Sequence, residues 1–289
     1  MSAAEIPLCF DCQGTPLVGM AHPAADAKTG VLIVVGGPQY RIGAHRQFIE
    51  LARGLAQAGI PAFRFDARGM GDSGGDFQGF EAIDDDIKAA IDAFMASSPD
   101  LENVVLWGLC DAASAILFYA HRDPRVAGAI LLNPWVRTEA SYAKTELKHY
   151  YGAKIIDGRF WRRLFTGEID LADAAGSFLK RLKSATGSGQ SGDGPTGSAP
   201  CRGMALSLPD RMLQGFTSFT GDIMLIISGN DLTAREFEEI TEASPDWTQA
   251  LSADRVRRHH IKASDHTFSR REWSEAVVNW TIGWITDLK

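Results

Sequence analysis

The chain has few cysteines and no long hydrophobic run. Four cysteines among 289 residues are too sparse for a disulfide-stapled secreted protein. No apolar stretch reaches the roughly 18 residues that a membrane-spanning helix requires. The first residues also lack the basic segment and apolar run that are typical of a secretory signal. We therefore expect a cytoplasmic protein without stable membrane insertion.

Positive charge and metal-ligand patterns are also scarce. The sequence has 29 Lys and Arg against 36 Asp and Glu, and a net charge of −7 argues against a nucleic-acid partner. Cys9 and Cys12 form a C-x-x-C pair, but no second Cys or His pair follows at a spacing that suits zinc. The acidic run at 84–86 resembles a metal cluster, yet it begins an amphipathic segment, where acids favour the helix dipole. We expect no metal and no cofactor.

Buried strands alternate with helical segments along most of the chain. A hairpin turning at Gln13 and Gly14 is expected first, and the short apolar runs after it are typical of strands buried on both faces. This alternation predicts an α/β fold whose central sheet is mostly parallel, with helices on both faces. The expected strands are 30–37, 60–69, 103–108, 126–135, 222–231 and 255–264, and a last helix carries Trp273, Val277, Trp280, Trp284 and Leu288 on its core-facing stripe.

The alternation stops between the fourth and fifth of these strands. We expect residues 1–136 and 219–289 to form the core and 137–218 to be an insertion, with a flexible Gly/Ser-rich segment at 184–200. Residues 137–183 contain ten Lys and Arg against six Asp and Glu. This surplus, with the aromatic residues beside it, favours a partly apolar, anionic substrate held by Tyr150, Trp161 and Arg162. A solvated helical decoration remains the alternative.

A candidate nucleophile stands at the end of the third strand. In the stretch GLCDA, Gly108 and Ala112 lie two residues either side of Cys110. A nucleophile at a sharp strand-to-helix turn needs such small neighbours because the backbone there is strained and crowded. Cys110 therefore occupies the position that a serine holds in many hydrolytic enzymes.

A base and an acid follow in the order that this architecture uses. Asp231 comes just after the strand DIMLIIS, and His266 lies in the loop after the next strand. Carboxyl ends of parallel strands meet at one edge of a sheet, so Cys110, His266 and Asp231 are predicted to form a catalytic triad. Asp265 and Asp222 are competing candidates for the acid. The other histidines fit less well: His22 in an early loop, His45, His121 and His149 in or beside helices, and His259 and His260 in a strand.

Several motifs resemble α/β-hydrolase-fold proteins. FRFDARGMGDSGG resembles the D-x-R-G-x-G-x-S loop after an early strand of that fold, and SGND and DHTF match its acid and histidine segments. VVGGPQYRIGAHRQF, FEAIDDDI, LWGLCDAASA, LNPWVRTE and LKHYYGAK are similar to the hydrolase 1 subfamily associated with the exosortase A system of exopolysaccharide-producing bacteria. The resemblance implies an α/β-hydrolase fold, a helical cap in the insertion and a hydrolytic activity. More distantly, a cysteine elbow resembles the dienelactone hydrolases.

The predicted oxyanion hole contains one irregular position. Its first donor is expected to be the backbone N–H of Asp111, directly after the nucleophile. The resemblance puts the second donor at Pro38, and proline has no N–H. Gln39 or Gly37 would then have to donate instead, and we favour Gln39, through its backbone N–H or its side-chain amide. Asp66 and Arg68 of the D-x-R-G loop are expected to order that loop.

These features predict hydrolysis of esters or thioesters through an acyl-cysteine intermediate. A thiolate is a strong nucleophile and a good leaving group, which suits activated acyl groups better than amides. The expected substrate is a small-molecule, lipid or saccharide acyl compound, and a homodimer is left open. Two alternatives remain: an acyltransferase to a saccharide, and a non-catalytic binding scaffold on the same fold.

Overall fold

An antiparallel hairpin begins the described part of the chain. The computed structural model describes residues 4–37, 39–136 and 206–288. Strand β1 (Ile6–Cys12) pairs with β2 (Thr15–His22), as predicted. The two turn residues, Gln13 and Gly14, have φ values of 53° and 82°, which matches the two-residue turn that suits the twist of a hairpin.

One eight-stranded sheet forms the centre of the fold, in the order β1-β2-β4-β3-β5-β6-β7-β8. The six strands from β3 onward are parallel, and the hairpin adds two antiparallel strands at one edge. The predicted α/β-hydrolase fold with a mostly parallel sheet is confirmed. These parallel strands are β3 (Thr29–Val34), β4 (Ala62–Asp66), β5 (Asn103–Leu109), β6 (Val126–Leu132), β7 (Asp222–Ser228) and β8 (Val256–Ile261).

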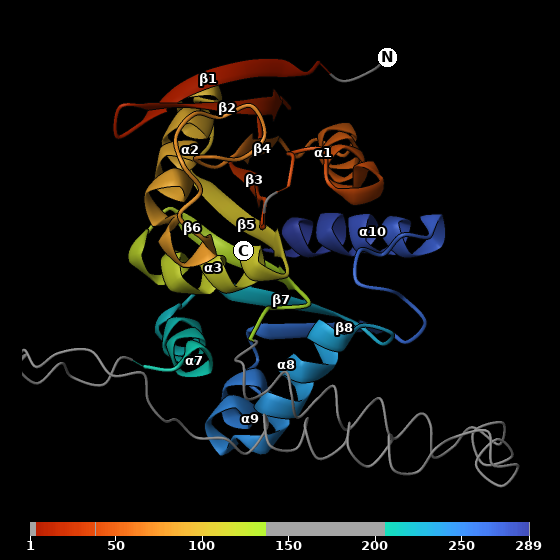
Figure 1. Cartoon of the computed structure of the whole chain (residues 1–289). Helices are drawn as coiled ribbons and strands as arrows, with labels where there is room; N and C mark the ends of the chain where they lie inside the picture. Colours follow the sequence, from red (N-terminus) through yellow and green to blue (C-terminus); the bar gives the residue numbers. More distant parts are fainter. Residues whose placement is uncertain (1–3, 38, 137–205, 289) are drawn as a thin grey trace, which may run out of the picture. The chain divides into compact units, whose positions relative to one another are not determined.

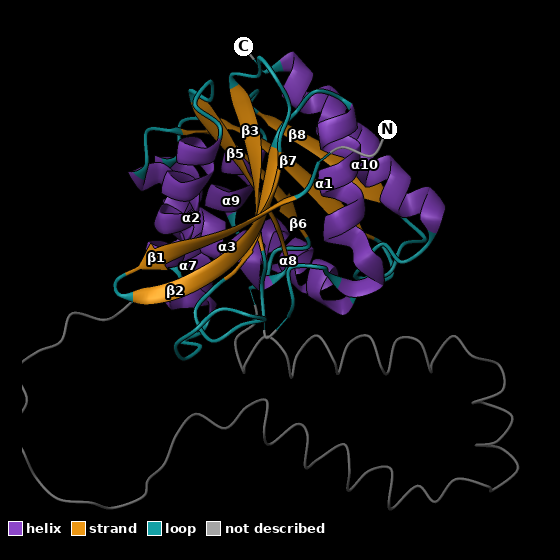
Figure 2. Ribbon diagram, turned by 90° about the horizontal axis from the view of Figure 1, so that it is seen from above, coloured by secondary structure: helices purple, strands orange, loops and turns teal. Residues whose placement is uncertain are grey.

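Helices cover both faces of this sheet. Helices α1 (Gln47–Gln57) and α10 (Arg271–Asp287) lie on one face, while α2 (Asp84–Ser97) and α3 (Asp111–Tyr119) lie on the other (Figures 1 and 2). On α10, Val277 and Trp284 are buried, and Trp280 stacks on His259 of β8 at 4.2 Å between ring centroids. No helix in the described ranges combines the length and the apolar content that crossing a bilayer demands.

Three further helices pack together: α7 (Leu208–Ser218), α8 (Leu232–Ala243) and α9 (Pro245–Leu251). Their contacts centre on the ring of Trp247, which packs edge-on against Phe216 and Phe237. Helix α7 also lies so close to α3 that a Cβ on Gly215 would overlap the carbonyl oxygen of Leu117.

The chain divides into two compact units, one of Met1–Val136 with Pro209–Lys289 and one of Arg137–Leu208. The sequence-based boundary at residue 218 therefore differs from the structure, because α7 packs with the first unit. Tyr150, Trp161, Arg162 and the segment 184–200 lie outside the described residues.

Candidate active site

Cys110 lies at a sharp turn between β5 and α3. Its backbone has φ 64° and ψ −124°, a conformation that a non-glycine residue keeps only when its surroundings enforce it. The Cys110 N–H donates to the carbonyl of Leu132 at 2.8 Å, and its own carbonyl accepts from Trp135 N–H at 3.2 Å. A Cβ on Gly108 would lie 2.9 Å from the backbone carbon of Ala112, so a larger residue would force the turn to shift. These contacts build the predicted elbow.

Asp231 serves the site and the fold at once. It follows β7 and is the N-cap of α8, where its carboxylate accepts from Thr233 N–H at 3.2 Å and Ala234 N–H at 3.1 Å. Its Oδ2 also lies 2.8 Å from His266 Nδ1. Because the helix cap fixes this carboxylate, His266 meets an acceptor of defined position.

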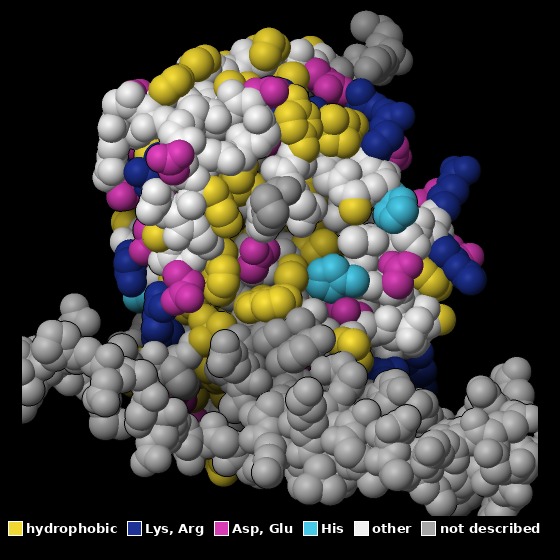
Figure 3. Space-filling model, in the orientation of Figure 1, with side chains coloured by type: hydrophobic (Ala, Val, Ile, Leu, Met, Phe, Trp, Pro, Cys, Tyr) yellow, Lys and Arg dark blue, Asp and Glu magenta, His cyan; other side chains and the backbone are white. Residues whose placement is uncertain are grey.

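The pKa of His266 is raised by its two neighbours. Burial acts to lower it, but hydrogen bonds with Asp231 and Cys110 and the nearby negative charge raise the pKa of His266 from 6.5 to about 10. With Nδ1 facing Asp231, Nε2 is the ring nitrogen left for the Cys110 thiol. The structure therefore places the His266 ring against the Asp231 carboxylate, with the Cys110 side chain among the groups that raise the pKa of His266. Figure 3 shows histidine side chains near acidic and hydrophobic ones on one face of the molecule.

The side chain of Asp111 lies against the loop after β3. Its Oδ2 accepts from Gly37 N–H at 2.7 Å and its Oδ1 from Ala112 N–H at 3.0 Å. Burial raises the pKa of this carboxyl, while its hydrogen bonds with backbone N–H groups, including that of Asp111 itself, act to lower it. A Cβ on Gly36 would overlap Asp111 Oδ1, so the contact requires glycine there.

Gln39 is placed differently from the simplest expectation. Its backbone N–H donates to the Gly37 carbonyl at 2.8 Å, within the same loop. The sequence suggests two donors on Gln39, its backbone N–H and its side-chain amide. Because the backbone N–H already donates to Gly37, the side-chain amide is the candidate oxyanion donor. Pro38 lies outside the described residues.

The loop after β3 is tied to the loop after β4 by an ion pair that the sequence did not suggest. The buried carboxylate of Asp66 accepts from the backbone N–H of Arg41 at 2.7 Å, pairs with the Arg41 guanidinium, and accepts from Asp72 N–H at 3.1 Å. Arg68 likewise pairs with Asp86, at 2.8 Å. The sequence predicts that Asp66 orders its own loop, and its bond from Asp72 N–H lies within that loop. Its bonds to Arg41 also connect two loops, because the two residues are 25 positions apart in the chain.

The competing acids lie elsewhere. Asp222 is the exposed first residue of β7, at the other end of that strand from Asp231. The Asp265 carboxylate accepts from Ser269 N–H at 3.0 Å, within its own turn. Asp231 is thus the acid whose hydrogen bond to His266 the structure shows.

Two other histidines have surroundings of their own. His22 is the last residue of β2, not part of a loop as the sequence suggested, because β2 continues to pair with β4. It accepts from Arg64 Nε at 3.0 Å, and burial, with the Arg64 charge, lowers the pKa of His22 to about 4. His259 stacks on Trp280.

The described ranges contain no cluster of side chains suited to binding a metal ion. No three His, Cys, Asp or Glu side chains gather there as a metal ion would need. Cys9 is exposed and Cys12 is buried, although both belong to β1, so the C-x-x-C pair is split between two environments. Asp84 and Asp86 lie in the first turn of α2, where Asp84 pairs with Arg122 at 2.5 Å.

Solved structures with this fold cover nearly the whole chain at low identity. An esterase of Pyrococcus furiosus, Pf2001, matches with a TM-score of 0.65 at 14% identity, over 99% of this chain and 92% of its own. Est1E of Butyrivibrio proteoclasticus, solved with ferulic acid, matches with 0.61 at 13%, over 97% and 98%. A dienelactone hydrolase of Anabaena variabilis matches with 0.62 at 14%, over 100% and 99%. No curated protein matches the chain.

The sequence itself matches a family. The profile described as "Serine aminopeptidase, S33" aligns with residues 27–174, from the strand before the candidate oxyanion loop through the cysteine elbow. This match covers just over half of the chain. The chain therefore belongs to the serine aminopeptidase S33 family and is an α/β-fold hydrolase.

Proposed function

We propose that this chain hydrolyses carboxylic esters or thioesters through a Cys-His-Asp triad and an acyl-cysteine intermediate. The observation that carries the proposal is the 2.8 Å contact between His266 Nδ1 and Asp231 Oδ2, beside a Cys110 side chain that raises the pKa of His266 from the turn after β5. A nucleophile beside a base that a third group orients is the arrangement that covalent acyl transfer needs.

In the proposed mechanism, His266 takes the proton of Cys110 Sγ, and the sulfur attacks the carbonyl carbon of the substrate. The tetrahedral intermediate collapses, the alcohol or thiol leaves with the proton that His266 returns, and the acyl group remains on sulfur. Water then gives a proton to His266 and attacks the acyl-cysteine. The acid is released and the thiol is restored. Asp231 holds the ring in place during both steps.

The oxyanion hole in this proposal uses the backbone N–H of Asp111 and the side-chain amide of Gln39. The Gln39 Nε2 atom lies 3.9 Å from the position of a Cβ on Gly37, so the amide stays close to the loop. Donors placed where negative charge develops are a large contribution to acyl-transfer catalysis. Asp111 contributes its backbone N–H once the substrate oxygen replaces its own carboxylate there, and that carboxylate also accepts from Gly37 N–H.

The substrate proposal rests on sequence alone. The resemblance to the exosortase A-associated hydrolases suggests a role linked to exopolysaccharide, with a small-molecule, lipid or saccharide acyl compound as substrate. Tyr150, Trp161 and Arg162 are proposed to bind it, because aromatic and basic side chains suit a partly apolar, anionic group. Transfer of the acyl group to a sugar hydroxyl is the alternative fate of the same acyl-cysteine, and a homodimer is the assembly we propose.

A burst assay tests the chemistry. Wild type is mixed with p-nitrophenyl acetate, p-nitrophenyl butyrate or butyryl-CoA, and intact mass is recorded after quenching. We expect a burst and one acyl adduct, both lost in Cys110→Ala. Cys9→Ala serves as the matched control because Cys9 is an exposed free thiol of β1. An adduct that disappears in Cys9→Ala and persists in Cys110→Ala would overturn the proposal.

The contacts of Asp111 favour a second candidate, a non-catalytic binding protein. Its carboxylate already engages Gly37 N–H beside the predicted hole. Iodoacetamide at neutral pH separates the two candidates, because a catalytic thiol reacts readily and an inert one does not. Rapid alkylation of Cys110 supports the enzyme, and a thiol that stays unmodified supports the binding protein.

A further inference from the structure

Asn133 is a buried polar residue at the carboxyl end of the sheet that the mechanism above does not use. It directly follows β6, is fully buried, and has φ 43°. This left-handed region is unfavourable for most residues, and asparagine tolerates it better than most. A polar side chain kept in such a place has to satisfy its hydrogen bonds inside the protein.

The Asn133 amide contacts both elements that carry the acid and the base. Its Oδ1 accepts from the backbone N–H of Ser228 at 2.8 Å, and Ser228 is the last residue of β7, three residues before Asp231. Its Nδ2 donates to Ser228 Oγ at 2.9 Å and to the backbone carbonyl of His266 at 3.0 Å. One side chain thus joins the end of β7 to the His266 loop.

Ser228 extends the contact to the neighbouring peptide. Its Oγ donates to the carbonyl of Asp265 at 2.8 Å while it accepts from Asn133. Two successive carbonyls, those of Asp265 and His266, are therefore held by Asn133 and Ser228. Both side chains are fully buried, so water does not compete for these bonds.

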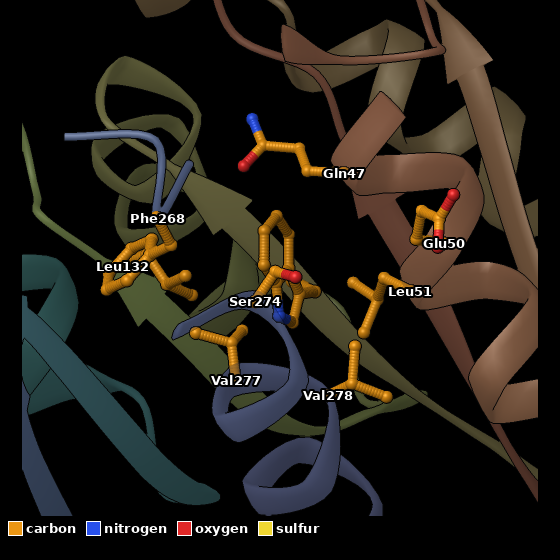
Figure 4. Close-up of a pocket in the computed structure, with 9 residues that line it drawn as sticks. Gln47, Glu50, Leu51, Leu132, Phe268, Ser274, Val277 and Val278 are labelled. Carbon is orange, nitrogen blue, oxygen red and sulfur yellow. The ribbon is translucent and has the colours of Figure 1, made fainter. Parts of the chain in front are cut away.

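The far side of the same loop is anchored by an apolar side chain. Phe268, two residues after His266, is 3% exposed and lines a narrow pocket with Leu132 of β6, Leu51 of α1 and Val277 of α10 (Figure 4). The loop is thus fixed through Phe268 by packing and through its carbonyls by hydrogen bonds. Packing alone does not set the rotation of the His266 peptide, whereas a bond to its carbonyl does.

We propose that Asn133 is a positioning residue for His266, and that with Ser228 it sets the His266 loop relative to the strand end that carries Asp231. The inference rests on the proposed function only where catalysis is measured. Its structural content is that the 2.8 Å contact between His266 Nδ1 and Asp231 Oδ2 depends on an amide that touches neither side chain.

The chemistry of the amide explains why this position needs asparagine. Two donated hydrogens and one acceptor are all used, and the isosteric aspartate would present a second oxygen to the His266 carbonyl. Ser228 Oγ has one hydrogen, which it gives to Asp265, so it also needs a donor from residue 133. Asn133→Asp therefore keeps the shape of the side chain but removes both bonds that Nδ2 donates, and it places an oxygen against the His266 carbonyl and Ser228 Oγ.

The direct test follows the titration of His266 by NMR. The Cε1–H signal of His266, assigned with His266→Gln, is recorded against pH in wild type, Asn133→Asp and Ser228→Ala. We expect the pKa of His266 to fall from about 10 in wild type toward 6.5 in both variants. Tyr119→Phe is the matched control, because it removes a buried 2.6 Å bond to Asp123 at the far end of α3 and should leave the titration unchanged.

Kinetics supply the second readout. With p-nitrophenyl acetate, kcat should fall by about 10- to 100-fold in Asn133→Asp, as expected for a displaced base, while KM changes by less than about twofold. Where Asn133→Asp does not fold, Ser228→Ala decides. Folded variants whose His266 titrates as in wild type would overturn the proposal. Activity that survives Cys110→Ala would instead contradict the proposed function and leave the titration result standing.

Discussion

The two halves of the candidate site are built in different ways. On the β7 and β8 side, Asp231 follows the buried strand β7, His266 lies in the loop after the edge strand β8, and their side chains meet at 2.8 Å. On the β3 side, the loop from Gly36 to Arg41 is held by side chains from two other parts of the chain, Asp111 and Asp66. Uncharged buried side chains at the strand ends, those of Asn133 and Ser228, hold the first half, whereas the carboxylates of Asp111 and Asp66 hold the second. The first half should therefore depend on neutral hydrogen bonds, and the second on charged ones.

The largest expected effect is the loss of the base. His266→Gln should lower kcat/KM for p-nitrophenyl acetate by about 10³- to 10⁴-fold, because removing one triad member removes most of the covalent catalysis. His260→Gln, a change at an exposed position of β8, is the matched control and should keep wild-type activity. Equal activities in the two variants would show that the β7 and β8 half does not act as proposed.

Replacement of the triad carboxylate, Asp231, should have the second-largest effect. Asp231→Asn is expected to reduce kcat by about 10³-fold, and Asp222→Asn, at the other end of β7, should not. The protonated His266 is the group that protonates the leaving group. Because its pKa is raised to about 10, wild type should lose this activity only as the pH approaches 10.

The same contact predicts a pH dependence of stability. A raised folded-state pKa means that the contribution of the His266 contact to the free energy of unfolding is complete below pH 6.5 and is lost as the pH rises toward 10. In Asp231→Asn, the alkaline limb of kcat/KM should move to lower pH. If the alkaline limb of this variant stays near pH 10, Asp231 is not the group that raises the pKa of His266.

Gly36→Ala tests the second half through packing. The added Cβ would overlap Asp111 Oδ1 and lie 2.7 Å from Ala112 N, so we expect destabilisation of about 1–3 kcal/mol, measured by urea unfolding. The double variant with Asp111→Ala should recover part of that loss. A double variant whose effects simply add would indicate that the Asp111 side chain is not what Gly36 accommodates.

The smallest effect is expected from the charge on Asp111. Asp111→Asn keeps an acceptor for Gly37 N–H and removes a negative charge next to Cys110. Iodoacetamide should then alkylate Cys110 faster, by roughly threefold, the size expected for one charge in a partly hydrated site. Asp92→Asn on α2 is the control. Slower alkylation would mean that Asp111 supports the thiolate rather than opposing it.

The sheet and the β7 and β8 half of the site were predictable because local patterns determine them. Apolar runs indicate most of the parallel strands, and the loops after β7 and β8 supply Asp231 and His266. Helix α8 was missed although a signal existed: aspartate is a favoured N-cap, and Asp231 caps α8 as well as facing His266.

Long-range contacts explain what the sequence did not reveal. Arg41 meets Asp66 across two loops, and Asn133 meets Ser228 across 95 positions of the chain, so neither pairing leaves a pattern at short spacing. The sequence places α7 in the insertion because strands and helices stop alternating between Val136 and Phe219. In the structure, a Cβ on Gly215 would overlap the Leu117 carbonyl, so α7 packs directly on α3. The sequence suggests Gln39 as the second oxyanion donor in place of Pro38. The bond from the Gln39 backbone N–H to the Gly37 carbonyl could not be foreseen, because it depends on the shape of the loop.

Covalent acylation of Cys110 is the central claim, and intact mass after a short incubation with p-nitrophenyl butyrate tests it most directly. Wild type should gain the mass of one butyryl group during a burst of p-nitrophenol, peptide mapping should place it on Cys110, and Cys110→Ala should show neither burst nor adduct. Steady p-nitrophenol release by Cys110→Ala at the wild-type rate, or turnover by wild type with no acyl group on Cys110 at any time point, would contradict the account.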